Sequence, residues 1–276
     1  MKWTIEQVYR DPIFHALNPK GKKFMGGRWL TRGLNEFLVP YEIRIAALIS
    51  FLTLPHIKSV PTIGMMLEDF KEGRYEGMHT IVVPSSGNTA HAVARLARAF
   101  GFSEVKAVLS TDVPPSKKEL LAALSSVEII EVGGGKSIAK RAQEEGQKQG
   151  HYLLDQYQHM GNVRSHFDFT GPEILRLLGE NLAVIAIAMG SGGTVAGVGR
   201  YLKQNRPGTV VLGVRPILGQ QVPGTRDEKR MAEVAYWTRR FRGSVCVGNG
   251  DFEGQSICKK TSVRESVRYL FQHANL

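Results

Sequence analysis

Short apolar runs alternate with amphipathic segments through most of this chain of 276 residues. Runs rich in Val, Ile and Leu predict strands, while apolar residues that recur every three or four positions predict helices with one buried face. The predicted strands are 80–83, 105–109, 127–132, 152–154, 182–188 and 210–214, and the predicted helices are 61–73, 90–100, 117–124, 136–148, 171–178 and 194–205. Repeated strand–helix–strand units are typical of parallel sheets with helices on both faces. We therefore predict an α/β fold with doubly wound parallel sheets.

The pattern is less regular towards both ends of the chain. Residues 1–40 mix short apolar and polar segments with Gly and Lys, which predicts an arm that wraps the body. The apolar run 43–54 stops at Pro55 and predicts a buried strand or a short helix. Thr170 is predicted to cap the helix that follows it. Near the carboxyl end the predicted elements are a helix over 231–241, a strand over 245–247 and a helix over 263–271.

The composition is that of an ordinary globular protein, with 42% hydrophobic residues and a formal net charge of +11. The basic residues are scattered without a long block, which favours an anionic cofactor or a small acid over nucleic acid as the partner. Cys246 and Cys258 are far apart and have no histidine cluster beside them, so neither a disulfide framework nor a metal site is predicted. The apolar run 45–57 is too short to span a membrane, and the amino terminus lacks the features of a secretory signal. We therefore expect a cytoplasmic protein.

Two strand-to-helix turns carry the candidate chemistry. The first is Pro84-Ser85-Ser86-Gly87-Asn88-Thr89, and the second, 189–194, follows the most hydrophobic strand and reads Met-Gly-Ser-Gly-Gly-Thr. In such turns backbone N–H groups and hydroxyls point outwards without a partner in the secondary structure. The first turn therefore predicts a site for an acidic or carbonyl-bearing ligand. The second predicts a phosphate cradle with the hydroxyls of Ser191 and Thr194, the alternative being a tight turn that needs glycine for its positive φ.

Two nucleotide-binding motifs are excluded by their spacing. Residues 133–137 read Gly-Gly-Gly-Lys-Ser, but the first glycine of a P-loop is replaced by Ile130. The run after Met189 has Val195 where the dinucleotide-binding pattern needs its third glycine. Nucleotide hydrolysis and dinucleotide binding are therefore disfavoured.

Taken together, the two turns resemble the cysteine synthase and cystathionine β-synthase family of fold-type II, tryptophan synthase β-like, pyridoxal-phosphate (PLP) enzymes. The resemblance spans roughly 55–215 and rests on Ser85-Ser86-Gly87-Asn88-Thr89, on 190–203, on Asp155-Gln156-Tyr157 and on Thr170-Gly171-Pro172-Glu173-Ile174. It implies a small lobe over 46–149 and a large lobe formed by 1–45 and 150–276, with the PLP cofactor in the cleft between them. It also implies a small amino-acid substrate and a homodimer.

The resemblance assigns roles to individual residues. Lys58 lies 28 residues before Ser86, where the family has the lysine whose amine condenses with the cofactor aldehyde. The implied contact to the cofactor ring hydroxyl comes from Asn88, and the implied phosphate ligands are Gly190, Ser191, Gly192, Gly193 and Thr194. The substrate carboxylate is expected at Ser85, Ser86, Gly87 and Thr89, with Gln156 assisting there.

The implied activity is a β-replacement or β-elimination on an amino acid such as O-acetylserine or serine, as in cysteine biosynthesis. Two alternatives stay open, a lyase that deaminates serine or threonine and a non-catalytic relative that serves as a binding or regulatory module. Three departures bear on them. The family's serine-valine before the lysine and aspartate-arginine after it are missing around Lys58, and Ala90 stands where a glycine is usual. Family members also continue into a strand and helix that contact the pyridine nitrogen, so we expect a truncated carboxyl end.

Overall fold

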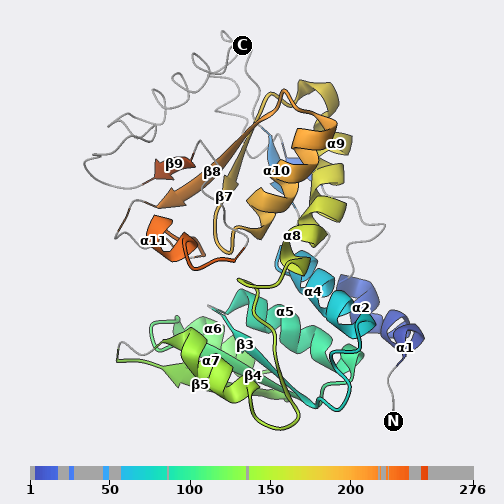
Figure 1. The fold of residues 1–276 in the computed structure, drawn as a ribbon, viewed down its shortest axis with the longest axis vertical. Coiled ribbons are helices and arrows are strands. Elements are labelled where there is room, and N and C mark those ends of the chain that lie inside the picture. Colours follow the sequence, from blue (N-terminus) through green and yellow to red (C-terminus); the bar gives the residue numbers. More distant parts are fainter. Residues whose placement is uncertain are drawn as a thin grey trace. The chain divides into compact units, whose positions relative to one another are not determined.

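Two units, each built on its own parallel sheet, make up the fold (Figure 1). The computed structural model describes residues 4–17, 25–27, 46–49, 57–85, 87–134, 137–216, 218, 222, 224–235 and 244–247. The first unit is Met1–Ser165 and the second is His166–Leu276. The predicted lobes, 46–149 and 1–45 with 150–276, follow the family's division of the chain and stay a prediction.

The sheet of the first unit has the strand order β5-β4-β3-β6, and every neighbouring pair is parallel. Its strands are β3 (Thr80–Pro84), β4 (Glu104–Ser110), β5 (Val127–Val132) and β6 (His151–Leu153). All five residues of β3 are buried, as a central parallel strand covered on both faces requires. The carboxyl end of β3 is therefore where the first candidate turn leaves the sheet.

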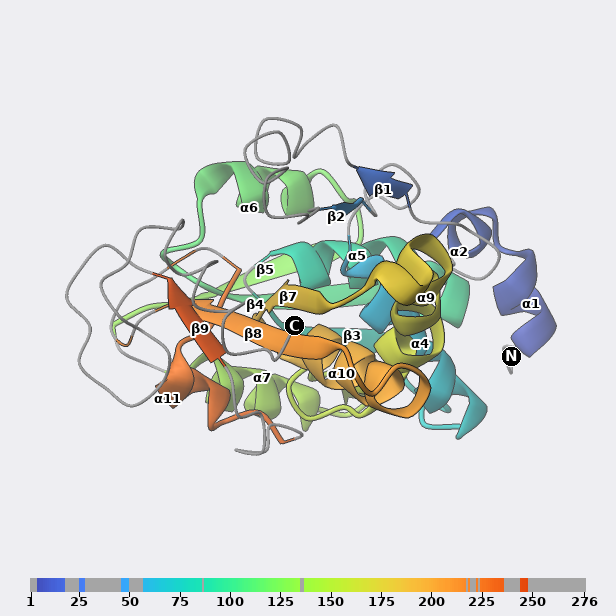
Figure 2. The ribbon, with the colours of Figure 1, turned by 90° about the horizontal axis from the view of Figure 1, so that it is seen from above.

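Helices cover both faces of this sheet. Besides the amino-terminal helices, the described part of this unit contains α4 (Ser59–Lys71), α5 (Asn88–Ala97, continued by a 3-10 turn Arg98–Phe100), α6 (Pro115–Ala122), α7 (Ile138–Gly146) and α8 (Gly161–Ser165). Figure 2 shows α5 and α6 on one side of the sheet and α7 on the other. Alternate strand residues divide accordingly, because Ile81 and Val83 join the core beneath α4 and α5, whereas Val82 packs with Ala142 of α7. This is the doubly wound arrangement that the sequence predicts.

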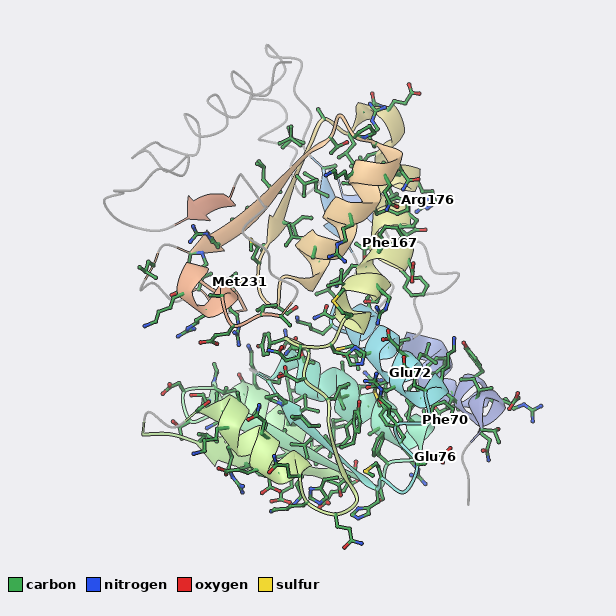
Figure 3. The ribbon with its side chains drawn as sticks, viewed as in Figure 1. Phe70, Glu72, Glu76, Phe167, Arg176 and Met231 are labelled. Atoms are coloured by element: carbon green, nitrogen blue, oxygen red, sulfur yellow. The ribbon has the colours of Figure 1, made fainter. Side chains whose placement is uncertain are left out.

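Part of the amino-terminal segment belongs to the core of the first unit. Helices α1 (Ile5–Arg10) and α2 (Pro12–Leu17) were not among the predicted elements, and the ring of Phe14 is fully buried 5.6 Å from that of Phe100. Phe70 of α4 joins the same aromatic cluster, 5.8 Å from the ring of Phe100 (Figure 3). A short strand β1 (Met25–Gly27) pairs antiparallel with β2 (Ala47–Ile49), which lies inside the predicted apolar run 43–54.

The second unit contains a three-stranded parallel sheet with the order β7-β8-β9. Its strands are β7 (Val184–Ala188), β8 (Val210–Pro216) and β9 (Ser244–Val247), and its helices are α9 (Gly171–Leu178), α10 (Gly193–Asn205), α11 (Glu228–Met231), a π-helical turn His166–Thr170 and a 3-10 turn Gly179–Asn181. Phe167 of the π turn stacks edge-on against Tyr201 of α10 at 5.5 Å (Figure 3). The predicted α/β class with parallel sheets is confirmed in both units.

One predicted detail of the second unit is wrong. Thr170 does not cap α9, because its backbone is helical (φ −71°, ψ −42°) and its side chain makes no cap hydrogen bond. The π turn leads directly into α9, and the Thr170 hydroxyl lies 2.8 Å from Nδ1 of His166 instead. Of the other predictions near the carboxyl end, residues 236–241, 263–271 and Cys258 lie outside the described residues.

Two negative findings concern the described residues alone. None of their helices combines the length and the apolar composition that crossing a membrane requires. Their His, Cys, Asp and Glu side chains form no group of three or more that could hold a metal ion.

Candidate active site

Lys58 stands at the beginning of α4, where it occupies the N-cap position with a helical backbone (φ −67°, ψ −15°). The residues that follow it, Ser59 and Val60, are almost completely buried. The helix is thus anchored in the core from its first turn, while the lysine side chain leaves it only partly buried. Lys58 Nζ donates a hydrogen bond to Oε1 of Gln156 at 3.2 Å.

Gln156 connects the lysine to the turn 84–89, called the asparagine loop after Asn88. Its side chain is 4% exposed, and the same Oε1 that accepts from Lys58 also accepts from the hydroxyl of Thr89 at 3.0 Å. The backbone oxygen of Gln156 accepts from Nδ2 of Asn162, at 2.8 Å. The structure therefore brings together Lys58, Thr89 and Gln156, three residues that the sequence assigns to the site. Asn162, which is fully buried, was missed by sequence reasoning.

The asparagine loop ends at Gly87, the N-cap residue of α5, which has a φ of +124° and no side-chain cap. Ser85 serves as a displaced cap, because its Oγ accepts hydrogen bonds from the N–H groups of Gly87 (3.0 Å) and Ala90 (3.2 Å). The N–H groups of Asn88 and Thr89, the first two of α5, have no acceptor within the helix and can bind an anion. The Asn88 side chain is exposed at this end, and Ser86 lies outside the described residues.

Two basic side chains lie close to this helix start. A Cβ added to Gly87 would lie 3.1 Å from Cδ of Lys117, so the stem of this α6 lysine packs over the loop. Burial, and then the nearby charge of Arg95, lower the pKa of His91 below its ordinary value. His91 is therefore neutral near pH 7, and Lys117 carries the positive charge near the loop.

The Gly-rich loop belongs to the second unit and follows β7. Gly192 is the N-cap residue of α10, has a φ of +83° and provides no side-chain cap. A Cβ added to Gly190 would lie 2.5 Å from the carbonyl oxygen of Gly224, so only glycine fits there. Ser191 is buried, and the N–H groups of Gly193 and Thr194 lie in the first turn of a 13-residue helix. This arrangement suits a phosphate group.

A buried histidine supports this loop and was also missed by sequence reasoning. His166 is 2% exposed, and its two ring nitrogens lie 2.8 Å from Oγ1 of Thr170 and 3.1 Å from Oγ1 of Thr194. Thr170 thereby fixes the ring orientation, and the ring fixes the Thr194 hydroxyl at the amino end of α10. π-Helical turns such as the one that carries His166 occur often at functional sites. The only sequence signal was a histidine four residues before Thr170.

Comparisons with known proteins found a matching family model and several similar proteins. The model of a family described as pyridoxal-phosphate dependent enzyme matches residues 60–253. Cysteine synthase B of Pseudomonas aeruginosa is 28% identical over 176 residues, which cover 62% of this chain and 57% of that protein. Cysteine synthase of Aquifex aeolicus is 28% identical over 244 residues, which cover 79% of this chain and 74% of that protein. The matched part of this chain thus spans little more than half the length of the first relative.

Solved structures give the same fold. An O-ureido-L-serine synthase superposes with a TM-score of 0.57 at 25% identity, over 62% of this chain and 58% of that chain. A hydrogen sulfide-producing enzyme from Fusobacterium nucleatum superposes with a TM-score of 0.66 at 20% identity, over 74% of this chain and 66% of that chain. At that identity the second likeness shows the fold alone.

Proposed function

Because this chain belongs to the family of pyridoxal-phosphate-dependent enzymes, we propose that it binds PLP at Lys58 and acts on the β-carbon of a small amino acid. The observation that carries the proposal is that Oε1 of Gln156 accepts two hydrogen bonds, one from Lys58 Nζ at 3.2 Å and one from the Thr89 hydroxyl at 3.0 Å. The amine proposed to bear the cofactor and the turn proposed to bind the carboxylate are thereby both hydrogen-bonded to the Gln156 side chain. A protein that used Lys58 only as a surface residue has no need of this contact.

The residues present fit PLP in chemical terms. A primary amine is what an aldehyde condenses with, and Lys58 supplies one beside the amide oxygen of Gln156. A phosphate needs clustered N–H and hydroxyl donors, which the start of α10 supplies with Ser191 and Thr194. Glycine at 190 and 192 keeps that backbone accessible, since a larger residue at 190 meets Gly224. Asn88, exposed at the start of α5, is the proposed contact of the ring hydroxyl.

When bound, PLP supplies an electron-withdrawing ring that stabilises negative charge at the α-carbon of the amino acid. Lys58 Nζ is the proposed base that takes the α-proton, and Gln156 holds this nitrogen on the side of the asparagine loop. The N–H groups of Asn88 and Thr89 bind the substrate carboxylate at the positive end of α5. Loss of a group from Cβ, with or without addition of a nucleophile, completes the proposed reaction.

The proposed substrate is O-acetylserine or serine, and the proposed nucleophile is sulfide, which places the chain in cysteine biosynthesis. Support comes from its likeness to proteins named cysteine synthase and O-ureido-L-serine synthase. Deamination of serine or threonine is the alternative within the enzyme class. A homodimer in the cytoplasm belongs to the same proposal.

A non-catalytic relative is the alternative outside the enzyme class. It is favoured by the residues after Lys58, where Ser59 and Val60 replace the charged pair of the family with uncharged, buried side chains. Such a protein would bind PLP without processing an amino acid. One experiment separates this alternative from the others.

The experiment titrates the purified protein with PLP and records the absorbance of the bound cofactor. Lys58→Ala is expected to abolish the bound-cofactor band, whereas Lys140→Ala, an exposed lysine on α7, is expected to leave it unchanged. The loaded protein then receives O-acetylserine with sulfide, serine or threonine, and cysteine, pyruvate and 2-oxobutyrate are assayed. Failure of the wild-type protein to bind PLP contradicts the proposal. Bound PLP without any product establishes the non-catalytic alternative.

A further inference from the structure

A second group of polar side chains surrounds the buried Asp69, in the last turn of α4. Asp69 is fully buried, and its Oδ2 accepts from the hydroxyl of Tyr152 at 2.7 Å. Its Oδ1 lies 2.8 Å from Nε2 of His159 and 3.1 Å from Nη1 of Arg74. Burial, and then the bond to Asp69, raise the pKa of Tyr152, so this hydroxyl stays a donor. A buried carboxylate is costly unless both oxygens are paired, and here both are.

The two partners of the His159 ring determine its tautomer. Its Nδ1 accepts a hydrogen bond from the N–H of Gly161 at 2.9 Å, so the proton of the neutral ring lies on Nε2 and is donated to Asp69. The ring is mostly buried, with 10% of the side chain exposed. The His159 ring therefore joins α4 to the turn 155–162, because Nε2 donates to Asp69 of α4 and Nδ1 accepts from Gly161 of the turn.

The same turn carries Gln156. Its backbone is closed by hydrogen bonds from the N–H of His159 to the oxygen of Asp155 (3.0 Å) and from the N–H of Asn162 to the oxygen of His159 (3.1 Å). Asn162 also donates its side-chain amide to the backbone oxygen of Gln156. His159 and Gln156 thus belong to one hydrogen-bonded unit, and a shift of one moves the other.

The turn 155–162 contacts α4 at both ends of the helix. Gln156 meets Lys58 at the beginning, and His159 meets Asp69 eleven residues later, about 16 Å along a regular helix. Between these points a Cβ on Gly161 would lie 2.9 Å from Cα of Met65, so the turn lies directly against the helix backbone. Because α4 is a rigid helix, the contact at Asp69 near its carboxyl end determines where the turn places Gln156.

We propose that the His159–Asp69 hydrogen bond is a positioning pair that places Gln156 in register with Lys58 and Thr89. Neither His159 nor Asp69 contacts the reacting groups, and both act through Gln156. The inference rests on the proposed function, because a register with Lys58 matters only where that amine carries the cofactor.

The test measures the reactivity of Lys58 in the full chain without cofactor. Lysines are reductively methylated with limiting formaldehyde, and mass spectrometry gives the labelling rate of Lys58 relative to exposed Lys140. Gln156→Ala removes the acceptor of Lys58 directly and is expected to raise this ratio at least threefold. His159→Asn keeps an oxygen near the Nδ1 position for Gly161 but cannot reach Asp69, and it is expected to raise the ratio as much.

Two matched variants separate positioning from general stability. His159→Gln keeps a donor near the Nε2 position and is expected to stay within twofold of the wild-type ratio. Tyr152→Phe removes a different hydrogen bond from Asp69, and is expected to lower the melting temperature without raising the ratio. If His159→Asn does not fold, Asp69→Leu, which keeps the size but has no acceptor for His159, is expected to raise the ratio in its place.

The proposal is overturned by a wild-type ratio in His159→Asn or, where that variant does not fold, in Asp69→Leu. It is equally overturned if Tyr152→Phe raises the ratio as much as His159→Asn does, or if Gln156→Ala leaves it unchanged. The labelling needs neither PLP nor turnover. Its failure is therefore distinguishable from failure of the proposed function, which the cofactor titration decides.

Discussion

Gly190 offers a direct test of the Gly-rich loop as a phosphate cradle. A Cβ added there would lie 2.5 Å from the carbonyl oxygen of Gly224. A close carbon–oxygen contact is about 3.3 Å, so the loop or residue 224 must move by about 0.8 Å. Overpacking of this kind costs about 1–3 kcal/mol. Both segments are backbone, so neither can relieve the clash by rotating a side chain.

The control is Gly208→Ala, because a Cβ at Gly208 meets nothing within 4 Å. Gly190→Ala is expected to lower the melting temperature by about 4–8 °C for a cost of 2 kcal/mol, and Gly208→Ala by no more than about 2 °C. The shifted N–H groups should also weaken PLP binding by about tenfold, equivalent to 1.4 kcal/mol, measured by absorbance titration. Equal melting temperatures for the two variants refute the steric argument. A large fall in stability with unchanged PLP affinity refutes the assignment of this loop to the phosphate.

Three further predictions address other parts of the chain. Gly87→Ala forces a φ of +124° on a residue with a Cβ and should lower the free energy of unfolding by about 1–3 kcal/mol in urea titration; an unchanged midpoint contradicts this. Thr194→Val removes the hydroxyl held by His166 and should weaken PLP binding about fivefold, for one hydrogen bond of about 1 kcal/mol, with little change in melting temperature. Burial alone raises the pKa of Glu145, but the hydrogen bond from Lys148 and nearby basic charges outweigh it and lower the pKa below 4.5. The resulting stability is present above about pH 4.5 and is lost as pH falls through the lowered pKa, so Glu145→Gln should flatten the decline of the urea midpoint between pH 5 and pH 3.

The strands and helices were predictable because the spacing of their apolar residues is a local property of the sequence. Apart from Thr80, β3 is apolar throughout, and it is buried at every position. The helix predicted over 90–100 is followed by Gly101, which has the left-handed φ of +89°. Helix α4 begins at Ser59, two residues before the predicted start at Pro61, because a proline in the first turn gives up an N–H group that has no acceptor there. Helix α1 has a capping box between Thr4 and Gln7, a signal that was available but was obscured by the mixed polarity of its surroundings.

Contacts between distant residues have no such local signal. His159 and Asp69 are 90 positions apart, and nothing in the spacing of either segment indicates that they meet. Lys58 and Gln156 are 98 positions apart, and only the resemblance to a family placed them in one site. The close approach of the turn to α4 requires glycine at position 161. This requirement is visible only in the structure, where the backbone of Met65 lies beside Gly161.

The hydrogen bonds of the asparagine loop change the expected chemistry of its side chains. The Ser85 oxygen already accepts from Gly87 and Ala90, and the Thr89 hydroxyl already donates its proton to Gln156. Ser85 therefore has only its proton to offer a carboxylate, and Thr89 must break a bond to offer its own. The backbone N–H groups of Asn88 and Thr89 have no acceptor within the helix, so they are the donors available without rearrangement. Polar side chains marked this turn in the sequence, but much of their hydrogen bonding shapes the loop, and carboxylate recognition falls to the backbone that they hold in place.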